Sequence, residues 1–419
     1  MLSHGNMLFD AYYGSKRLGD VQREDVFLSF LPLSHVLERT AGYHAPLMLG
    51  AHVAFAESVE KVVENMQEVR PTTMVCVPRL FEKIYARIHE NVHQMNPLRR
   101  RLFFSAVELG RRYVELRYVK RQPAGGLALR YRLADRLVFR KIRQKFGGRL
   151  RFCISGGAPL DKTINEFMWV IGIPVFEGYG LTETSPALTL STKDALRFGS
   201  VGKALEKTEL TLAEDGELLV RGPQVMRGYY RNEEGTAAVF QDGWLKTGDI
   251  ARIDGEGFVH IIDRKKEIII TSGGKNIAPQ PIESELKLDK YISQAMVYGD
   301  GRPYLVALLT PYIERLLELA QQENIHYFDV EDLVSNEKVL ALFEERIAAV
   351  NERLPSYETI KKFALIPRDF SVDGGELTPT LKLKRKVIYQ KYQDKIDRLY
   401  LEPGNGFPER EASDNGGNR

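Results

Sequence analysis

The chain has 419 residues, of which 43% are apolar and 27% are charged, so hydrophobic cores can form and the composition argues against general disorder. The length suggests two to four domains. Its two cysteines, Cys76 and Cys153, are too few for a disulfide framework or a thiolate zinc site. The sequence after Met1 lacks a signal-peptide pattern, and no apolar run approaches the ~20 residues of a membrane span. We therefore expect a soluble, cytoplasmic enzyme.

Up to about residue 180, short apolar runs alternate with amphipathic stretches, as in βαβ units. Strands are predicted at 72–77, 150–155 and 174–178, and helices from about Leu80 and at 161–170. This alternation favours a parallel sheet with helices on both faces. Ligands bind beyond the carboxyl ends of such strands. Two glycine-rich breaks, at 155–158 and 177–180, are expected at that edge.

The net charge of +3 hides a strongly basic segment. Between Arg99 and Arg149, sixteen Lys or Arg residues oppose three acidic ones, so the rest of the chain carries −10. Leucines and aromatic residues interleave with these arginines and predict two basic amphipathic helices, broken at 123–126, in an insertion over 97–149. The insertion either packs on the large domain with a solvated basic face or contacts an anionic membrane peripherally. A nucleic-acid partner is not expected, because no recognition motif accompanies the charge.

From about residue 197 the pattern changes to short strands and turns. A hairpin is predicted at 208–221 around Asp215-Gly216, and a strand at 257–263, which together indicate a β-rich subdomain over 197–263. Further on, helices at 312–322 and 337–354 and a strand at 361–367 indicate a mixed domain. The predicted class is α/β: a parallel-sheet large domain (1–264) with a β-rich subdomain, a smaller mobile α+β C-terminal domain (265–401), and a disordered tail (402–419).

Two segments contain residues suited to nucleotide chemistry. In residues 177–184, Glu-Gly-Tyr-Gly-Leu-Thr-Glu-Thr, the glycines let backbone approach a flat ligand and Tyr179 offers an aromatic face. The Thr182 hydroxyl can bond a phosphate and the Glu183 carboxylate can hold Mg²⁺. In residues 244–249, Asp249 can accept hydrogen bonds from ribose hydroxyls. An ordinary strand-to-helix turn and an Asx turn are the structural alternatives for these two segments.

Four runs in chain order carry a family resemblance: Ser-Gly-Gly-Ala-Pro-Leu at 155–160, the run at 177–184, Trp-Leu-Lys-Thr-Gly-Asp at 244–249 and Asp-Arg-Lys-Lys at 263–266. In this order they resemble the adenylate-forming superfamily, which includes acyl-CoA synthetases, firefly luciferase and nonribosomal peptide adenylation domains. The runs at 31–39, 271–279 and 377–385 make the chain most similar to a long-chain fatty acyl-CoA synthetase. The resemblance extends from Met1 to about Tyr400.

The resemblance implies that the protein joins a fatty acid to coenzyme A through an acyl-adenylate, with ATP as the second substrate and Mg²⁺ as cofactor. Thr182 would contact the α-phosphate and Glu183 would bind Mg²⁺. Asp249 would hold the ribose, and Arg264 would lie beside ribose and phosphate. The implied adenine pocket consists of Gly157, Ala158, Glu177, Gly178, Tyr179 and Gly180.

Three further positions take roles from the resemblance. Lys382 matches the lysine that reaches the site during adenylation; Lys384 and Lys386 are less favoured, because the family lysine directly follows a Thr-x pair. Lys266 matches the interdomain hinge, about which the small domain would rotate between the two half-reactions. His35 matches a histidine near the acyl pocket, and a core histidine stays open as the alternative.

One departure concerns the family's Ser/Thr/Gly-rich loop, which wraps the β- and γ-phosphates and stands directly before a Met-Leu-Ser-His-x-Asn run. Here that run begins at Met1. We therefore expect the chain to lack the loop and the N-terminal part of the large domain, and to have little or no synthetase activity by itself. Two alternatives remain open: an acyl-AMP ligase or other carboxylate–CoA ligase, and a non-catalytic fragment that acts as a binding module.

Overall fold

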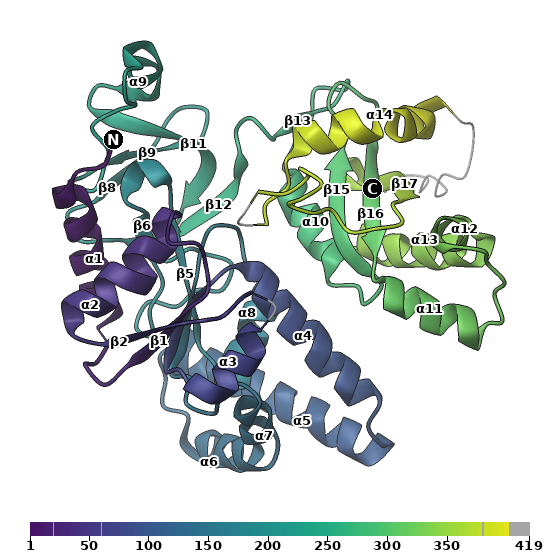
Figure 1. Cartoon of the computed structure of the whole chain (residues 1–419), viewed down its shortest axis with the longest axis horizontal. Helices are drawn as coiled ribbons and strands as arrows, with labels where there is room; N and C mark the ends of the chain where they lie inside the picture. Colours follow the sequence, from purple (N-terminus) through teal and green to yellow (C-terminus); the bar gives the residue numbers. More distant parts are fainter. Residues whose placement is uncertain (20, 60, 379–380, 402–419) are drawn as a thin grey trace, which may run out of the picture. The chain divides into compact units, whose positions relative to one another are not determined.

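The computed structural model describes residues 1–19, 21–59, 61–378 and 381–401 (Figure 1), so the predicted disordered tail at 402–419 lies outside the described residues. The chain divides into two compact units, Met1–Lys265 and Lys266–Arg419. The predicted boundary stood one residue earlier, between residues 264 and 265. Each unit is described separately below.

The first unit is built on a seven-stranded sheet whose order is β2-β1-β3-β4-β5-β6-β7. All residues of β3 and β4 are buried, as expected for strands covered on both faces. The first five strands pair in parallel, which agrees with the predicted parallel sheet although β1 and β2 were not themselves predicted, and the last two pair antiparallel. The strands are β1 (Val26–Ser29), β2 (His52–Phe55), β3 (Thr73–Cys76), β4 (Phe152–Ser155), β5 (Val175–Gly180), β6 (Ala187–Leu190) and β7 (Lys203–Ala204).

The antiparallel edge was not predicted. The sequence pattern places a turn after Gly178, but β5 continues to Gly180 and pairs with β6. A Cβ atom at Gly180 would lie 1.6 Å from the carbonyl oxygen of Pro186, so the two strands approach more closely than any side chain allows. The glycine that suggested a loop is therefore the residue that permits strand pairing.

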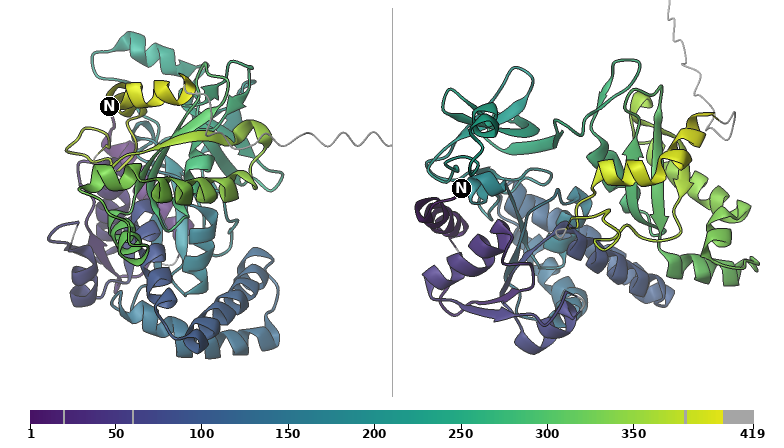
Figure 2. Two further views of the ribbon diagram at one scale, coloured as in Figure 1. Left: turned by 90° about the vertical axis from the view of Figure 1, so that its right-hand side faces the viewer. Right: turned by 45° about the horizontal axis from the view of Figure 1, so that its top comes forward.

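Helices cover the sheet (Figures 1 and 2): α1 (His4–Leu18), α2 (Ala45–Leu49), α3 (Val62–Val69), α4 (Pro78–His93), α5 (Pro97–Val114), α6 (Gly125–Ala134), α7 (Arg140–Gln144) and α8 (Lys162–Val170), with π-helical turns η1 (Glu38–His44), η2 (Glu115–Val119) and η3 (Asp135–Phe139). The Asp161 side chain caps α8 by accepting from the amides of Thr163 and Ile164. In the basic insertion, α5 packs so closely on α8 that a Cβ at Gly110 would lie 2.6 Å from Val170.

A second sheet forms the β-rich part of this unit, in the order β10-β11-β9-β8 with β12 on β11. Its elements are β8 (Glu209–Leu212), β9 (Glu217–Arg221), α9 (Glu233–Val239), β10 (Phe240–Gln241), β11 (Trp244–Ile253) and β12 (Val259–Arg264). The predicted hairpin is present as β8 and β9. Alternate residues of β11 are buried, and this alternation turns Asp249 to the buried face.

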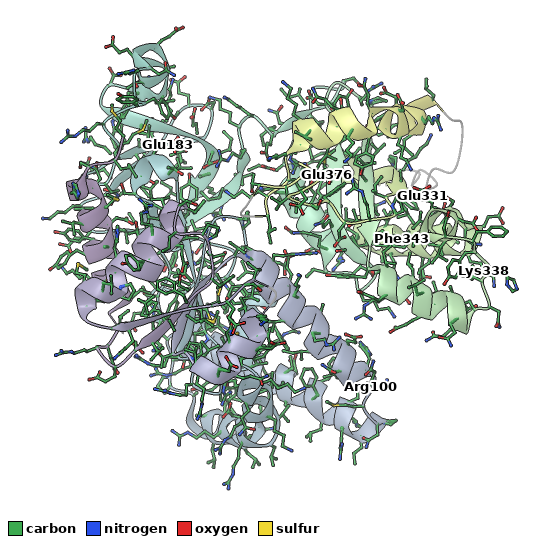
Figure 3. The ribbon with its side chains drawn as sticks, viewed as in Figure 1. Arg100, Glu183, Glu331, Lys338, Phe343 and Glu376 are labelled. Atoms are coloured by element: carbon green, nitrogen blue, oxygen red, sulfur yellow. The ribbon has the colours of Figure 1, made fainter. Side chains whose placement is uncertain are left out.

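The second unit contains a three-stranded sheet of β15 (Ile292–Tyr298), β16 (Leu305–Pro311) and β17 (Ile360–Leu365). One face packs on α10 and α13 through a core that includes Phe343, and the other packs on α14 through Ile388 and Ile396 (Figures 1 and 3). The remaining elements are β13 (Ile269–Ile270), β14 (Asn276–Ile277), α10 (Pro279–Lys287), α11 (Ile313–Gln322), α12 (Val330–Ser335), α13 (Glu337–Asn351), η5 (Ser356–Glu358) and α14 (Arg385–Leu401). No helix in the described ranges is both long and apolar enough to cross a membrane.

Candidate active site

The candidate site lies at the carboxyl ends of β4 and β5. Gly156 and Gly157 directly follow β4, and Gly157 adopts a φ of 84° that favours glycine. A Cβ at Gly156 would lie 3.5 Å from the carbonyl oxygen of Gly178, so the two glycine-rich segments are side by side. Ala158 is exposed and Gly157 is half-buried. A flat ligand can therefore reach the backbone of both segments.

The Glu177 side chain lies beneath this edge and is only 6% exposed. Its Oε1 accepts a hydrogen bond from Asn165 Nδ2 at 2.7 Å, and the carboxylate also accepts from the Leu160 amide. Burial raises the pKa of Glu177 to about 7, against the lowering effect of these two bonds. The side chain of Glu177 thus holds the loop at 155–160 in place from beneath, and the backbone of Glu177 belongs to the glycine-rich segment that faces a ligand.

Tyr179, Asp249 and Arg264 form a connected chain of polar groups. The Tyr179 hydroxyl donates to Asp249 Oδ2 at 2.5 Å, and Arg264 Nε lies 3.0 Å from Asp249 Oδ1. Asp249 and Arg264 are cross-strand partners on β11 and β12. Burial, followed by the neighbouring Asp249, raises the pKa of Tyr179 well above its usual value. A carboxylate has about four acceptor positions, so Asp249 can accept further hydrogen bonds from a ligand.

Thr182 and Glu183 stand on a short 3₁₀ turn, η4 (Thr182–Thr184). The Thr184 hydroxyl fixes this turn, since it accepts from the Leu181 amide at 2.9 Å and lies 2.7 Å from the Pro186 carbonyl. Glu183 Oε1 accepts from the Tyr229 hydroxyl at 2.9 Å, and the Thr182 side chain is exposed.

The donor set around Glu183 fits Mg²⁺. Mg²⁺ is usually bound by one or two carboxylates together with substrate phosphates and water. Within the described ranges, no group of three or more acidic, histidine or cysteine side chains is arranged to hold a metal. A single half-buried carboxylate next to an exposed threonine hydroxyl suits a metal that arrives with phosphates.

His35 belongs to the loop after β1, and this loop reaches the same edge. His35 Nδ1 accepts from the Leu37 amide at 3.3 Å, which places the ring proton on Nε2. The Leu37 side chain lies 3.3 Å from the Cβ position of Gly156. The structure therefore brings His35 into the neighbourhood of the glycine-rich segments, and its role near an acyl group stays a prediction.

The two residues that flank Lys266 form ion pairs in different units. Lys265 Nζ pairs with Asp215 at 2.6 Å and with Glu217 at 2.8 Å, both in the first unit. Glu267 pairs with Arg385 at 3.0 Å in the second unit. Lys266 lies between these two anchors in an exposed turn.

Lys382 lies on a loop of the second unit whose ends are held in place. The Thr378 amide donates to the Lys382 carbonyl at 2.8 Å, while Pro379 and Thr380 lie outside the described residues. At the base of the loop, Glu376 is fully buried and pairs with Arg368 at 2.6 Å and Lys391 at 2.9 Å (Figure 3). Burial alone would raise the pKa of Glu376, but these cations lower it to about 2. Lys382 is half-buried, whereas Lys384 and Lys386 are exposed.

Two residues of the site were missed in the sequence. Asn165 lies on the buried face of α8 with Ile164 and Phe167, but polar residues such as Glu166 also occur on this helix, so the sequence does not single Asn165 out. Tyr229 contacts Glu183 across 46 positions of sequence, and its surroundings contain no pattern that predicts the contact.

Comparison with known proteins agrees with this geometry. Residues 1–230 match the AMP-binding enzyme family, and residues 266–403 match the AMP-binding enzyme C-terminal domain. The chain belongs to the AMP-binding enzyme family. The first match lies within the first unit, and the second match begins at the first residue of the second unit.

Several members of the AMP-binding family resemble the chain over most of its length. Long-chain-fatty-acid–CoA ligase FadD15 of Mycobacterium tuberculosis is 39% identical over 386 residues, which cover 91% of this chain and 63% of FadD15. Human long-chain-fatty-acid–CoA ligase ACSBG1 is 35% identical, over 96% of this chain and 59% of ACSBG1. The adenylation domain of a Mycobacterium chelonae carboxylate reductase has the same fold, with a TM-score of 0.72 at 23% identity over 94% of this chain and 57% of that chain.

Proposed function

We propose that the protein takes part in the ATP-dependent ligation of a long-chain fatty acid to coenzyme A through an acyl-adenylate intermediate, with Mg²⁺ as cofactor. The observation that carries the proposal is the Tyr179–Asp249–Arg264 chain beside the two open glycine-rich segments. This arrangement offers an aromatic face, a carboxylate and a guanidinium to an adenosine monophosphate. The similarity to FadD15 and ACSBG1, which are long-chain-fatty-acid–CoA ligases, supports a long-chain fatty acid as the acyl substrate.

In the first half-reaction, a fatty-acid carboxylate attacks the α-phosphorus of ATP and pyrophosphate leaves. Negative charge increases on the phosphate oxygens, and the Thr182 hydroxyl, Arg264 and Lys382 would stabilise it by hydrogen bonding and by charge. Mg²⁺ held by Glu183 would supply further charge neutralisation. The adenine would lie against Tyr179 and the backbone of the segments at 156–158 and 177–180, and the ribose would bond to Asp249. We place His35 near the acyl end.

In the second half-reaction, the thiol of coenzyme A attacks the carbonyl carbon of the acyl-adenylate and AMP leaves. Charge now develops at a carbonyl, so a lysine suited to the phosphorus is no longer needed. Lys266 is proposed as the hinge that removes Lys382 between the steps. It is exposed, while its two neighbours are fixed in different units by Lys265–Glu217 and Glu267–Arg385.

Lys382→Ala, introduced into a longer chain that contains the phosphate-binding loop, tests the proposal when the half-reactions are measured separately. Palmitate-dependent exchange of pyrophosphate into ATP reports the first half-reaction, and conversion of supplied palmitoyl-AMP with coenzyme A reports the second. We expect the first rate to fall by about 10²–10³ and the second to change little, because the lysine acts only on charge at phosphorus. The neighbouring Lys386→Ala is the matched control. Equal losses in both half-reactions would contradict the assignment, and absence of the second half-reaction in the unsubstituted chain would favour the binding-module alternative.

A peripheral contact between the basic insertion and an anionic membrane is a second proposal. The favouring observation is that leucines remain exposed on the helices of this insertion, with Leu98 79% and Leu129 71% exposed. Arg99, Arg100 and Arg101 adjoin the first of these leucines (Figure 3). Near an anionic membrane each basic residue contributes ~1 kcal/mol to binding. Such a contact would place the protein at the membrane, into which its proposed substrate, a long-chain fatty acid, partitions.

A further inference from the structure

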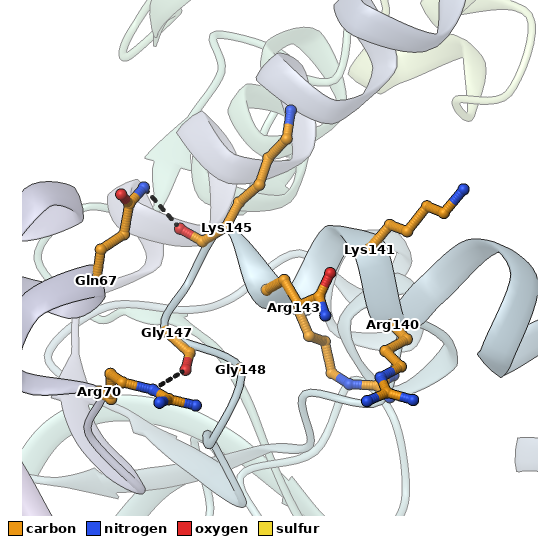
Figure 4. Close-up of a pocket in the computed structure, with 9 residues that line it drawn as sticks. Gln67, Arg70, Arg140, Lys141, Arg143, Lys145, Gly147 and Gly148 are labelled. Carbon is orange, nitrogen blue, oxygen red and sulfur yellow. Dashed lines mark hydrogen bonds between the residues drawn. The ribbon is translucent and has the colours of Figure 1, made fainter.

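A basic pocket of about 660 Å³ lies at the end of the parallel sheet opposite to the candidate active site (Figure 4). Arg70 precedes β3 and Gly147 precedes β4, and these strands are parallel, so the pocket is at their amino ends. The nucleotide segments instead follow the carboxyl ends. Among the residues that line the pocket there is no carboxylate, and five are cationic: Arg70, Arg140, Lys141, Arg143 and Lys145.

Backbone packing fixes one wall of the pocket. Gly147 approaches α3 so closely that a Cβ would lie 2.3 Å from the Met66 carbonyl oxygen. Arg70 ends α3 with a φ of 51°, its amide donates to the Met66 carbonyl, and its Nε donates to the Gly147 carbonyl at 3.1 Å (Figure 4). Non-glycine residues are uncommon in this left-handed region. The guanidinium of Arg70 is therefore held in a defined position rather than extended freely into solvent.

Most of the positive charge in the pocket is uncompensated. Arg143 is neutralised, because it forms a two-bond pair with Asp135 and also donates to the Ile171 carbonyl. In the part of the chain that the structure describes, Arg70, Arg140, Lys141 and Lys145 pair with no carboxylate. Four cations that line one pocket without ion-paired carboxylates favour a ligand with more than one negative charge.

A stripe of exposed leucines leads to the pocket. Leu129, Leu133 and Leu137 are 71%, 61% and 53% exposed and recur every fourth residue along the continuous helical stretch formed by α6, η3 and α7. The next residue at this spacing is Lys141, which lines the pocket. An apolar stripe that ends in a basic pocket matches the boundary between lipid acyl chains and head groups.

We infer that this pocket binds the phosphomonoester head group of an anionic phospholipid while the leucine stripe enters the acyl region below it. A soluble phosphate or a nucleic acid would account for the cations but not for the exposed leucines, and an apolar protein partner would account only for the leucines. A phosphomonoester is accessible from several sides and carries up to two charges, so it can contact several cations at once. The inference rests on the membrane contact proposed above and does not depend on ligase activity.

Vesicle co-sedimentation of the full chain tests the inference. Phosphatidylcholine vesicles are doped either with phosphatidic acid, a phosphomonoester, or with phosphatidylglycerol, a phosphodiester, at equal surface charge. We expect at least about fivefold preference for phosphatidic acid, the effect of roughly one basic contact. Lys141→Gln/Lys145→Gln should abolish the preference. Leu129→Ser/Leu133→Ser should weaken binding to both kinds of vesicle, while the preference for phosphatidic acid stays the same as in the native chain.

The matched control is Arg99→Gln/Arg100→Gln, which removes two exposed cations outside the pocket. It should retain the preference even if total binding falls, and circular dichroism should show equal helix content in all variants. Binding to neither vesicle would overturn the membrane contact itself. Binding without the preference, or a preference that survives Lys141→Gln/Lys145→Gln, would overturn the pocket assignment alone. Displacement of the chain from vesicles by millimolar inorganic phosphate would reassign the pocket to a soluble anion.

Discussion

Asp249 shows how a single residue combines stability with ligand recognition. It is 3% exposed and contacts both an aromatic hydroxyl and a guanidinium. Charge-assisted hydrogen bonds contribute roughly 1.5–3 kcal/mol each, about twice as much as neutral ones. An ionised Asp249 is therefore both anchored by Tyr179 and Arg264 and able to hold a ribose strongly.

The carboxyl of Glu177 predicts a measurable pH dependence of stability. Its pKa is about 7 in the folded chain and near 4.5 ordinarily, so the folded state holds the proton more tightly. The free energy of unfolding should thus decrease as pH rises from 4.5 to 7 and level off above 7. Glu177→Gln removes this titration. The amide that this substitution introduces can still form a hydrogen bond. Asn165 Oδ1 is buried without a partner, so after a flip of the Asn165 amide this oxygen accepts from the new side-chain NH₂ group.

We expect the stability of the native chain relative to Glu177→Gln to fall by up to roughly 3 kcal/mol between pH 5 and pH 8. Urea unfolding followed by tryptophan fluorescence measures this in the first unit, where both tryptophans, Trp169 and Trp244, are found. Glu214→Gln, at an exposed turn, is the control and should show no such trend. A pH-independent difference for Glu177→Gln would show that the carboxylate is fully stabilised by its hydrogen bonds.

Among the elements, the β5–β6 pair depends on glycine at position 180. With Gly180→Ala, the Cβ would overlap the Pro186 carbonyl, so the strands must separate and displace Tyr179. We expect a loss of more than about 3 kcal/mol in the free energy of unfolding, together with weaker AMP binding. Gly14→Ala in α1 is the matched control, since nothing lies within 4 Å of its Cβ position. There the change should be neutral or stabilising by up to about 1 kcal/mol. Unchanged stability of Gly180→Ala would contradict the observed pairing.

The same pair illustrates what the sequence could and could not predict about the fold. The strands β3 and β4 and the β8–β9 hairpin follow from local signals, namely continuous apolar runs and the Asp215-Gly216 turn. The strands β1, β2 and β6 were not predicted, although β1 lies in an apolar run much like those of β3 and β4, and their places in the sheet are set by long-range pairing. In the site, residues that belong to short sequence motifs, such as Tyr179 and Asp249, were predicted. Asn165 and Tyr229 could be recognised as site residues only from the folded arrangement.

At the scale of the whole molecule, the proposed mechanism needs a hinge at Lys266. In a longer chain that contains the phosphate-binding loop, Lys266→Pro fixes φ near −65° and should leave palmitate-dependent adenylation largely intact while blocking thioester formation from supplied palmitoyl-AMP. Lys266→Ala, which keeps the backbone free, should behave like the native chain in both assays. AMP affinity, measured in parallel, checks that the neighbouring Lys265 contacts survive. Normal thioester formation by the proline variant would show that Lys266 is an ordinary exposed lysine between two units.

The central claim is that the first unit holds the adenylate of a long-chain acyl group. Calorimetric titration of the full chain with a non-hydrolysable palmitoyl-adenylate analogue, in which a sulfamate replaces the phosphate, tests it most directly. We predict binding at least about tenfold tighter than that of AMP, because the acyl chain adds buried apolar area. Asp249→Asn should weaken both ligands about tenfold, and Asp242→Asn, at an exposed hairpin turn, should change neither. An analogue that does not bind, or that binds equally well to native chain and Asp249→Asn, would contradict the account.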